Sequence, residues 1–333
     1  MRREYWQIAA GSRGRDYADR FLQFGMAFVG GDEHVKRMGE VSVGDVVLLK
    51  RGLSQVVSVG EIVQRNGVCK GEGDKDWLRD FDGWDLPAYC YVDWRVLSVP
   101  VDTEGLTRTT IQRVPQEKHR RLADSLFSLP VREHEPEPQP TKDIRDEQIL
   151  RFLISEGLRP SAADELTNTF RRIRLLADHY YQDGNWDDIR EHETRTFLVA
   201  PLLLTLGWAE QQVKIELPCS CGRIDIACFS HVYRRKNDEC VLLIETKDFG
   251  SGLDYAPDQA RRYAEDFPEC QVLVVSNGWC YKTFLRSAVG ESFNDRPSAY
   301  LNILRPRDRY PLDPLHVDGA LGVLKWLLPS SLR

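Results

Sequence analysis

Residues 241–247, with the sequence Val-Leu-Leu-Ile-Glu-Thr-Lys, form an apolar run that ends in charged side chains. The run predicts a buried strand. Because the side chains of a strand alternate between its two faces, Glu245 and Lys247 project to the same side at the mouth of the sheet. Asp225, within Gly-Arg-Ile-Asp-Ile-Ala at 222–227, can face them from a neighbouring strand. Two carboxylates that converge in this way make a hard oxygen site suited to Mg²⁺.

The segments around this run predict alternating helices and strands. Helices are expected at 189–206 and 257–267, and strands at 212–217, 223–230, 239–245, 270–276 and 280–285. Two stretches with apolar residues at helical spacing, 144–155 and 162–181, precede them and predict a helical connector. The order indicates a mixed α/β arrangement.

A Pro- and Glu-rich segment separates this region from the N-terminal part of the chain. Residues 132–140 contain no apolar side chain other than Pro and are typical of an extended, solvated linker. Upstream, Gly-punctuated runs predict a small, mainly β barrel with strands at 5–10, 45–50, 55–63 and 89–99 and helices at 16–24 and 115–127. We therefore expect a β domain at 1–130, the linker at 131–147, the connector at 148–188 and an α/β domain at 189–333.

Composition restricts the class of protein only partly. The 333 residues carry 45 Lys and Arg against 51 Asp and Glu, a net charge of −6. This balance alone argues against a polyanion ligand, but half of the net charge lies in the linker, so a basic groove can exist elsewhere. No apolar run approaches the roughly 20 residues that a bilayer requires, and no export signal is visible, so a soluble cytoplasmic protein with no membrane partner is expected. The eight Cys residues are expected to be mostly buried free thiols, since no second ligand pair completes a metal site with Cys219 and Cys221.

Further motifs lie on both sides of the strand that ends in Glu-Thr-Lys. Glu-Thr-Arg at 193–195 is followed by an apolar helix that ends in Leu-Gly-Trp at 206–208, and Gln259 and Tyr263 are four residues apart on the next predicted helix. The run at 272–279 is an apolar strand that leads into an Asn-Gly turn. In this order the motifs resemble the PD-(D/E)XK nuclease superfamily, and more closely the N-terminal nuclease domain of type I restriction R subunits.

The resemblance implies a Mg²⁺-dependent DNA endonuclease with an αβββαβ catalytic domain, in which Mn²⁺ can substitute. It implies the site residues Asp225, Glu245, Lys247, Glu193, Gln259 and Tyr263. Asp225, Glu245 and Glu193 would hold the metal, and Lys247 would orient or help to deprotonate the attacking water. Glu191 is the alternative to Glu193, because two helix residues that are two apart cannot share a face.

The first domain resembles the EVE branch of the PUA-like barrels, a group that includes YTH-like readers of modified bases. The resemblance covers residues 3–100 and rests on Tyr-Trp at 5–6, Gly-Asp at 44–45 and the late Trp94. It implies an aromatic pocket that holds an unstacked base. Candidate walls are Trp6, Trp77, Trp84, Tyr89, Tyr91 and Trp94, although burial in the core is the alternative for each. Candidate contacts to the DNA backbone are Arg13, Arg15, Arg171, Arg172 and Arg174, with an ordinary solvated surface as the alternative.

These expectations combine into a modification-dependent restriction enzyme in phage defence. Its partner would be double-stranded, base-modified DNA, and a homodimer would cut both strands. One alternative is a nuclease effector that a soluble nucleotide activates through the first domain. A second alternative is a non-catalytic reader of nucleic acid that uses the nuclease fold as a scaffold.

Overall fold

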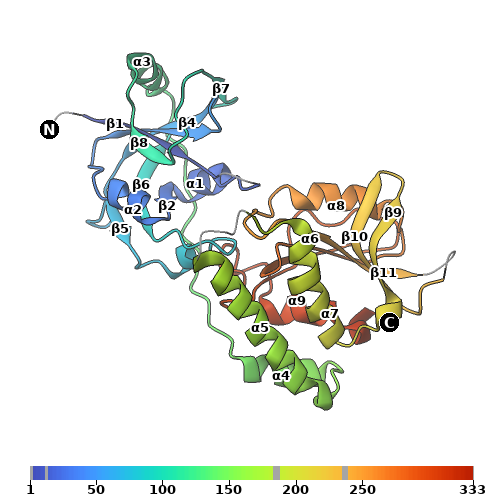
Figure 1. Cartoon of the computed structure of the whole chain (residues 1–333). Helices are drawn as coiled ribbons and strands as arrows, with labels where there is room; N and C mark the ends of the chain where they lie inside the picture. The colour runs from blue at the N-terminus through green and yellow to red at the C-terminus, as the bar shows by residue number, and fades with distance from the viewer. Residues whose placement is uncertain (1–2, 12–13, 183–187, 235–238, 333) are drawn as a thin grey trace. The chain divides into compact units, whose positions relative to one another are not determined.

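The computed structural model describes residues 3–11, 14–182, 188–234 and 239–332, and the chain divides into two compact units, Met1–Pro138 and Gln139–Arg333 (Figure 1). Each unit has its own sheet, and the mixed α/β class expected from the sequence is confirmed. No helix among the described residues is both long and apolar enough to cross a membrane.

The first unit is built on a curled, open sheet with the strand order β2-β6-β4-β3-β1-β8, with β5 added to β6 and β7 to β4. The strands β1 and β3 are parallel, and the other pairs are antiparallel. Its elements are β1 (Tyr5–Ala9), α1 (Ala18–Phe24), β2 (Met26–Val29), α2 (Asp32–Met38), β3 (Val46–Arg51), β4 (Gln55–Ile62), β5 (Lys70–Glu72), the 3-10 helix η1 (Asp76–Asp80), β6 (Ala88–Trp94), β7 (Val101–Asp102), β8 (Ile111–Arg113) and α3 (Glu117–Leu126). The sheet curls into a half-barrel, so the small β barrel expected from the sequence is confirmed only in part.

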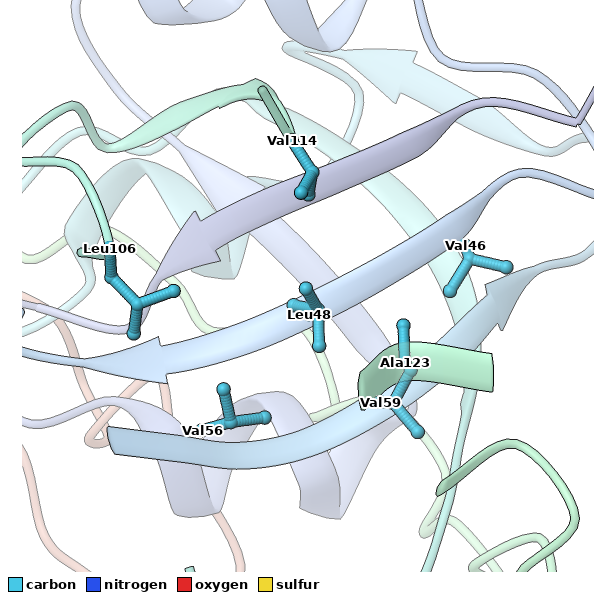
Figure 2. Close-up of a cluster of buried hydrophobic side chains, with 7 residues drawn as sticks. All are labelled: Val46, Leu48, Val56, Val59, Leu106, Val114 and Ala123. Carbon is cyan, nitrogen blue, oxygen red and sulfur yellow. The ribbon is translucent and has the colours of Figure 1, made fainter. Parts of the chain in front are cut away.

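One part of the core of this unit lies between β3, β4 and α3 (Figure 2). Leu49 pairs with Ser58 but Lys50 pairs with Val56, so Val57 is an extra residue that forms a β-bulge. Because of this bulge, Val56 and Val59 lie on one face although they are three residues apart. The cluster comprises Val46, Leu48, Val56, Val59, Leu106, Val114 and Ala123.

The second unit holds a six-stranded sheet with the order β14-β13-β12-β11-β10-β9. Only β11 and β12 are parallel, and the helix α8 connects them along the chain. The sheet elements are β9 (Val213–Cys219), β10 (Gly222–Phe229), β11 (Cys240–Thr246), α8 (Ala256–Ala264), β12 (Val272–Ser276), β13 (Cys280–Leu285) and β14 (Ala299–Asn302). The helices outside this run are α4 (Asp146–Ser155), α5 (Ala163–Gln182), α6 (Glu191–Thr194), α7 (Ala200–Thr205) and α9 (Ala320–Leu327), with short 3-10 helices η2 (Pro160–Ala162), η5 (Glu210–Gln212) and η6 (Pro329–Leu332).

The helices α6 and α7 are joined by a π-helical segment, η4 (Arg195–Val199). Pro201 follows at the start of α7, where its missing N–H and its ring disturb the regular bonding of the preceding turn. The wider turn is closed by the Ala200 N–H, which donates to the Arg195 carbonyl oxygen five residues earlier. Such π turns often occur at functional sites.

The linker is extended but is not free in solvent along its whole length. Near its start the Arg132 N–H donates to the Trp94 carbonyl at 2.7 Å, and the Glu135 N–H donates to the Gln23 carbonyl at 2.7 Å. Near its end, the Ile144 N–H donates to the Pro306 carbonyl at 2.9 Å. Both ends are therefore bound to the unit that they adjoin, while most residues of the linker are exposed to solvent, as the sequence predicts.

The turn between β12 and β13 supports the helix that carries part of the candidate site. Gly278 has a φ of +93°, and a Cβ there would lie 2.9 Å from Thr194 Cγ2 and still closer to a methyl group of Leu198. Asn277 braces the turn, because its side-chain N–H donates to the Ser251 carbonyl at 3.0 Å and its Oδ1 accepts from the Cys280 N–H at 3.0 Å. Only glycine lets the helix and this turn approach so closely.

We expect Gly278→Ala to lower the free energy of unfolding by about 2–4 kcal/mol, because strain at positive φ adds to overpacking against the helix. Gly290→Ala is the matched control, since Gly290 has a φ of +80° and nothing lies within 4 Å of the added Cβ. Urea denaturation of both variants measures the difference. Equal losses in the two variants would contradict the proposed contact.

Candidate functional site

Three carboxyl groups converge beside the end of β11 in the second sheet. Glu191 begins α6, Asp225 lies in β10 and Glu245 lies near the end of β11, and one carboxylate oxygen of each lies within 4.8 Å of the others. Ile226 pairs with Ile244 across β10 and β11, so Asp225 and Glu245 are the next residues along these two strands. The structure thus brings together the two strand carboxylates that the sequence selected.

The helix carboxylate of this cluster is Glu191 rather than Glu193. Glu193 Oε2 instead accepts a hydrogen bond from the Arg190 backbone N–H at 3.1 Å and so caps the helix. Two helix residues that are two apart point about 200° apart around the axis, so only one of them can face the sheet. The structure places Glu191, the alternative that the sequence left open, beside Asp225 and Glu245 and leaves Glu193 outside this cluster, while the metal role of either residue stays a prediction.

Lys247 lies within the same group and is held by several acceptors. Its Nζ lies 2.6 Å from Glu245 Oε1, 3.0 Å from Gln259 Oε1 and 3.8 Å from Glu191 Oε1. The Gln259 side-chain amide in turn donates to the Tyr263 hydroxyl at 2.8 Å. Lys247, Gln259 and Tyr263, all expected from the sequence, therefore form one hydrogen-bonded chain next to the carboxylates.

Burial and mutual repulsion shift the proton affinities of this group. Desolvation, and after it the Asp225 charge, raise the pKa of Glu191 to about 8 and that of Glu245 to about 7. Burial alone would lower the pKa of Lys247, but Glu245 and the other carboxylates outweigh it and raise the pKa. Lys247 is therefore an ammonium in this arrangement, and it donates hydrogen bonds rather than accepting a proton.

Asp225 is fixed on both of its oxygens. Its Oδ2 accepts from the Thr246 backbone N–H at 2.6 Å and from the Thr246 hydroxyl at 2.8 Å. Its Oδ1 accepts from the Arg195 guanidinium at 2.6 Å. The Asp225 side chain therefore has little freedom to rotate away from the cluster.

Arg195 and Glu216 are residues of this site to which the sequence gave no role. The Arg195 side chain is 5% exposed and bridges Asp225 to Glu216 Oε1, which lies 2.6 Å away. Glu216 is the β9 residue opposite Asp225, and its φ is +52°, a strained conformation for a residue other than glycine. Arg195 belongs to the Glu-Thr-Arg motif and could have been found from it, but no pattern in the sequence signals the backbone of Glu216.

The aromatic residues proposed for a base pocket fall into two groups. Trp6 and Trp94 are core residues, because both are almost fully buried and their indole N–H groups donate to Asp45 Oδ2 at 3.0 Å and to the Met26 carbonyl at 3.2 Å. Tyr89 is also buried, and its hydroxyl donates to Asp74 at 2.9 Å. These three residues do not line an open pocket in this structure.

Trp77, Tyr91 and Trp84 have other partners. Trp77 is also buried, and both it and the partly exposed Tyr91 donate hydrogen bonds to Glu137. Trp84 is half-buried, and the Arg15 guanidinium carbon lies 3.3 Å from the centroid of its ring. Arg15, proposed for the DNA backbone, is thus stacked on an aromatic face.

The other arginines proposed for DNA contact also differ from one another. Arg174 is paired in a bidentate fashion with Asp146 at 2.7 and 2.8 Å and donates to the Ile303 carbonyl at 2.9 Å, so it fixes α4 to α5. Arg171 and Arg172 are exposed on α5. Arg13 lies outside the described residues.

Comparison with known protein families finds a match in the second unit, in the part of the chain that carries the carboxylate cluster. Residues 190–295 match the family described as the type I restriction enzyme R protein N terminus (HSDR_N). The matched segment contains Asp225, Glu245, Lys247, Gln259 and Tyr263, together with Arg195. It covers less than half of the chain and leaves the first unit unassigned. A search of curated proteins found no match to the chain. The region 190–295 is therefore similar to the N terminus of a type I restriction enzyme R protein.

We expect Glu245→Gln to change how stability depends on pH in metal-free buffer. Because the folded pKa of Glu245 is raised to about 7 from an ordinary value of 4.5, the folded state binds more protons between these pH values. Wild-type stability therefore falls as pH rises through this window, and the variant is spared that loss. Between pH 5 and pH 8, the free energy of unfolding of the variant should therefore rise by about 1–3 kcal/mol relative to that of wild type. Urea titrations in EDTA measure this difference.

The matched control for this measurement is Glu193→Gln, which removes a neighbouring carboxylate outside the cluster. Comparison of the two variants separates the loss of a carboxylate within the cluster from the loss of a carboxylate near it. Parallel profiles for wild type and Glu245→Gln would show that Glu245 does not carry the raised pKa.

Proposed function

We propose that the protein is a Mg²⁺-dependent endonuclease that hydrolyses phosphodiester bonds in DNA. The observation that carries the proposal is the cluster of Glu191, Asp225 and Glu245 with the Lys247 ammonium beside it. The similarity of residues 190–295 to a restriction-enzyme domain favours DNA over other phosphodiesters.

The donor set fits a divalent cation of the Mg²⁺ type. All three groups offer carboxylate oxygens, which are the ligands that Mg²⁺ and Mn²⁺ prefer. Burial first, and the Asp225 charge second, raise the pKa values of Glu191 and Glu245, and a bound cation would favour the ionised form of both groups. We assign the metal to Glu191, Asp225 and Glu245. When bound, such an ion stabilises the negative charge that develops on the phosphoryl oxygens.

The remaining side chains have separate roles in this proposal. The Lys247 ammonium orients a water molecule or a phosphate oxygen, and Gln259 and Tyr263 hold Lys247 in place. Arg195 and Thr246 prevent rotation of Asp225. The arrangement is a preorganised set of charges, which is the main means by which enzymes accelerate phosphoryl transfer.

For the first unit we propose reading of a modified base, which would make the protein a modification-dependent restriction enzyme that acts on phage DNA. Stacking of Arg15 on the half-buried Trp84 supports a site at this position, because a flat cation over an indole ring resembles the packing of a base between two planes. The same proposal includes an EVE-like fold for the first unit. It also includes a homodimer on DNA and a cytoplasmic location.

The decisive test is a digestion panel of plain, methylated, hydroxymethylated and glucosylated phage DNA with Mg²⁺. We expect Lys247→Ala to lower the cleavage rate by about 10²- to 10³-fold, because it removes a fixed positive charge from the reacting phosphate. Lys325→Ala is the control, since Lys325 is a partly exposed lysine on α9 that pairs with Glu156 at 2.9 Å. If Lys247→Ala cleaves every substrate as wild type does, the nuclease proposal fails.

The same panel separates the alternatives for the first unit. Cleavage that ignores base modification but begins on addition of a soluble nucleotide identifies a signal-activated effector. Binding of DNA without cleavage of any substrate identifies a non-catalytic reader.

A second prediction tests the choice of metal ligand. Glu191→Gln should weaken Mg²⁺ binding by about 10- to 100-fold, a range seen even for residues that only support metal ligands. Glu193→Gln should leave the affinity within about twofold of wild type. Isothermal titration with Mg²⁺ and the free Mn²⁺ signal in electron paramagnetic resonance measure both variants without reference to activity. The reverse order of effects would assign the metal to Glu193.

A further inference from the structure

The carboxylate of Glu137, near the end of the first unit, is bound by three side chains of that unit. Lys75 Nζ lies 2.6 Å from Oε2 and 2.7 Å from Oε1, the Tyr91 hydroxyl donates to Oε1 at 2.9 Å, and the Trp77 indole N–H donates to Oε2 at 3.3 Å. We call Lys75, Trp77 and Tyr91 the Glu137 site. Both oxygens of a single anion are thus met by a cation and by two neutral donors.

The three donors belong to well-packed parts of the fold. Trp77 lies in η1, is 6% exposed and packs against Phe24 with ring centroids 5.0 Å apart. The Lys75 side chain is 13% exposed, and its ammonium lies 4.6 Å from the centroid of the Tyr89 ring and 5.4 Å from that of Tyr91. Burial alone would lower the pKa of Lys75, but the bonds to Glu137 and Tyr91 outweigh it and raise the pKa. An anion at this place therefore stabilises the Lys75 ammonium.

The acceptor, in contrast, belongs to the linker. Glu137 lies between Pro136 and Pro138 in a segment without regular secondary structure, and its side chain is 32% exposed. The carboxylate can leave the site without any change in a strand or a helix. The donors of this interaction are therefore held in place by the fold, whereas the acceptor can move.

We propose that the Glu137 site binds a phosphate group of nucleic acid, and that Glu137 occupies it when no nucleic acid is bound. This inference rests on the proposed function, which makes DNA the substrate. Two non-bridging phosphate oxygens carry one negative charge and accept hydrogen bonds from the same kinds of donor as a carboxylate does. The partly exposed Tyr91 ring beside Lys75 suits the neighbouring sugar or base.

Occupation by Glu137 has a defined effect on affinity. A ligand that must displace a bound group has its apparent affinity reduced by the fraction of molecules in which the site is free. Glu137 therefore lowers the apparent affinity for DNA that binds weakly and without specificity. A DNA that makes further contacts elsewhere, such as a modified base at Trp84, gains enough binding free energy to displace Glu137.

The test compares Glu137→Gln with Glu135→Gln in the full chain. Each substitution removes one negative charge from the linker, but Glu135 bonds to Gln23 and not to the Glu137 site. Binding of a fluorescein-labelled DNA duplex is measured by anisotropy in EDTA, so that no cleavage occurs. We expect Glu137→Gln to bind the duplex about three- to tenfold more tightly than Glu135→Gln does.

A second variant keeps the inference testable if charge changes disturb folding. Trp77→Phe retains a ring in the core but removes the indole donor, and in the Glu137→Gln background it should reverse most of the gain in affinity. Titration with deoxycytidine monophosphate in place of the duplex shows whether a terminal nucleotide phosphate or the DNA backbone is the ligand.

Equal duplex and nucleotide affinities for Glu137→Gln and Glu135→Gln, with a loss of thermal stability only in Glu137→Gln, would overturn the proposal and leave Glu137 as a structural clip. The proposed nuclease function is judged separately, because it depends on cleavage by wild type and Lys247→Ala. Tighter binding by Glu137→Gln without cleavage by wild type would support this site and reject the nuclease.

Discussion

Three carboxyl groups within 4.8 Å of one another, two of them on adjacent strands, are the constraint around which the second unit is arranged. Because Asp225 and Glu245 are buried, the repulsion between them is strong, and it is met by two cations, Lys247 and Arg195. Each cation has an anchor of its own outside the cluster. Gln259 holds Lys247, and Glu216 holds Arg195. The site is thus a network of alternating charges in which the distance between carboxylates is maintained by their partners.

The backbone around this network is correspondingly unusual. The helix that presents Glu191 continues through a π-helical segment, and Gly278 allows that segment to approach the β12–β13 turn. Glu216 has a positive φ on the strand next to Asp225. Of these three places Glu216 carries backbone strain, because a positive φ is unfavourable for a residue other than glycine, and packing elsewhere in the fold must offset that cost.

Part of this arrangement could be predicted from the sequence. The period-two pattern of 241–247 placed Glu245 and Lys247 on one side of a strand, and it needed only the neighbouring strand to bring in Asp225. The choice between Glu191 and Glu193 was beyond the sequence, because it depends on where the helix begins and how it turns. The role of Glu216 depends on a single backbone angle, which side-chain patterns do not encode.

In the first unit, too, some elements and residue roles could not be predicted from the sequence. Strand β2 was missed because Met-Ala-Phe-Val at 26–29 continues the apolar character of the helix before it, and Gly25 in the left-handed conformation is what ends that helix. Trp6 and Trp94 could not be separated from Trp84 by composition, since indole rings suit both a core and a binding surface. The helix α9 contains Ala-Leu-Gly-Val-Leu-Lys-Trp-Leu, in which apolar residues dominate and weaken the amphipathic signal.

The bulge at Val57 restricts how the length of β4 can change during evolution. The extra residue lets Val56 and Val59 face the same core, so the strand has a fixed phase relative to β3. Loss of one residue here would turn one of these valines toward the opposite face, whereas the same loss in an exposed turn alters only the connection. Lineages of this protein should therefore vary in length at the turns of the first unit and keep the length of β4 constant.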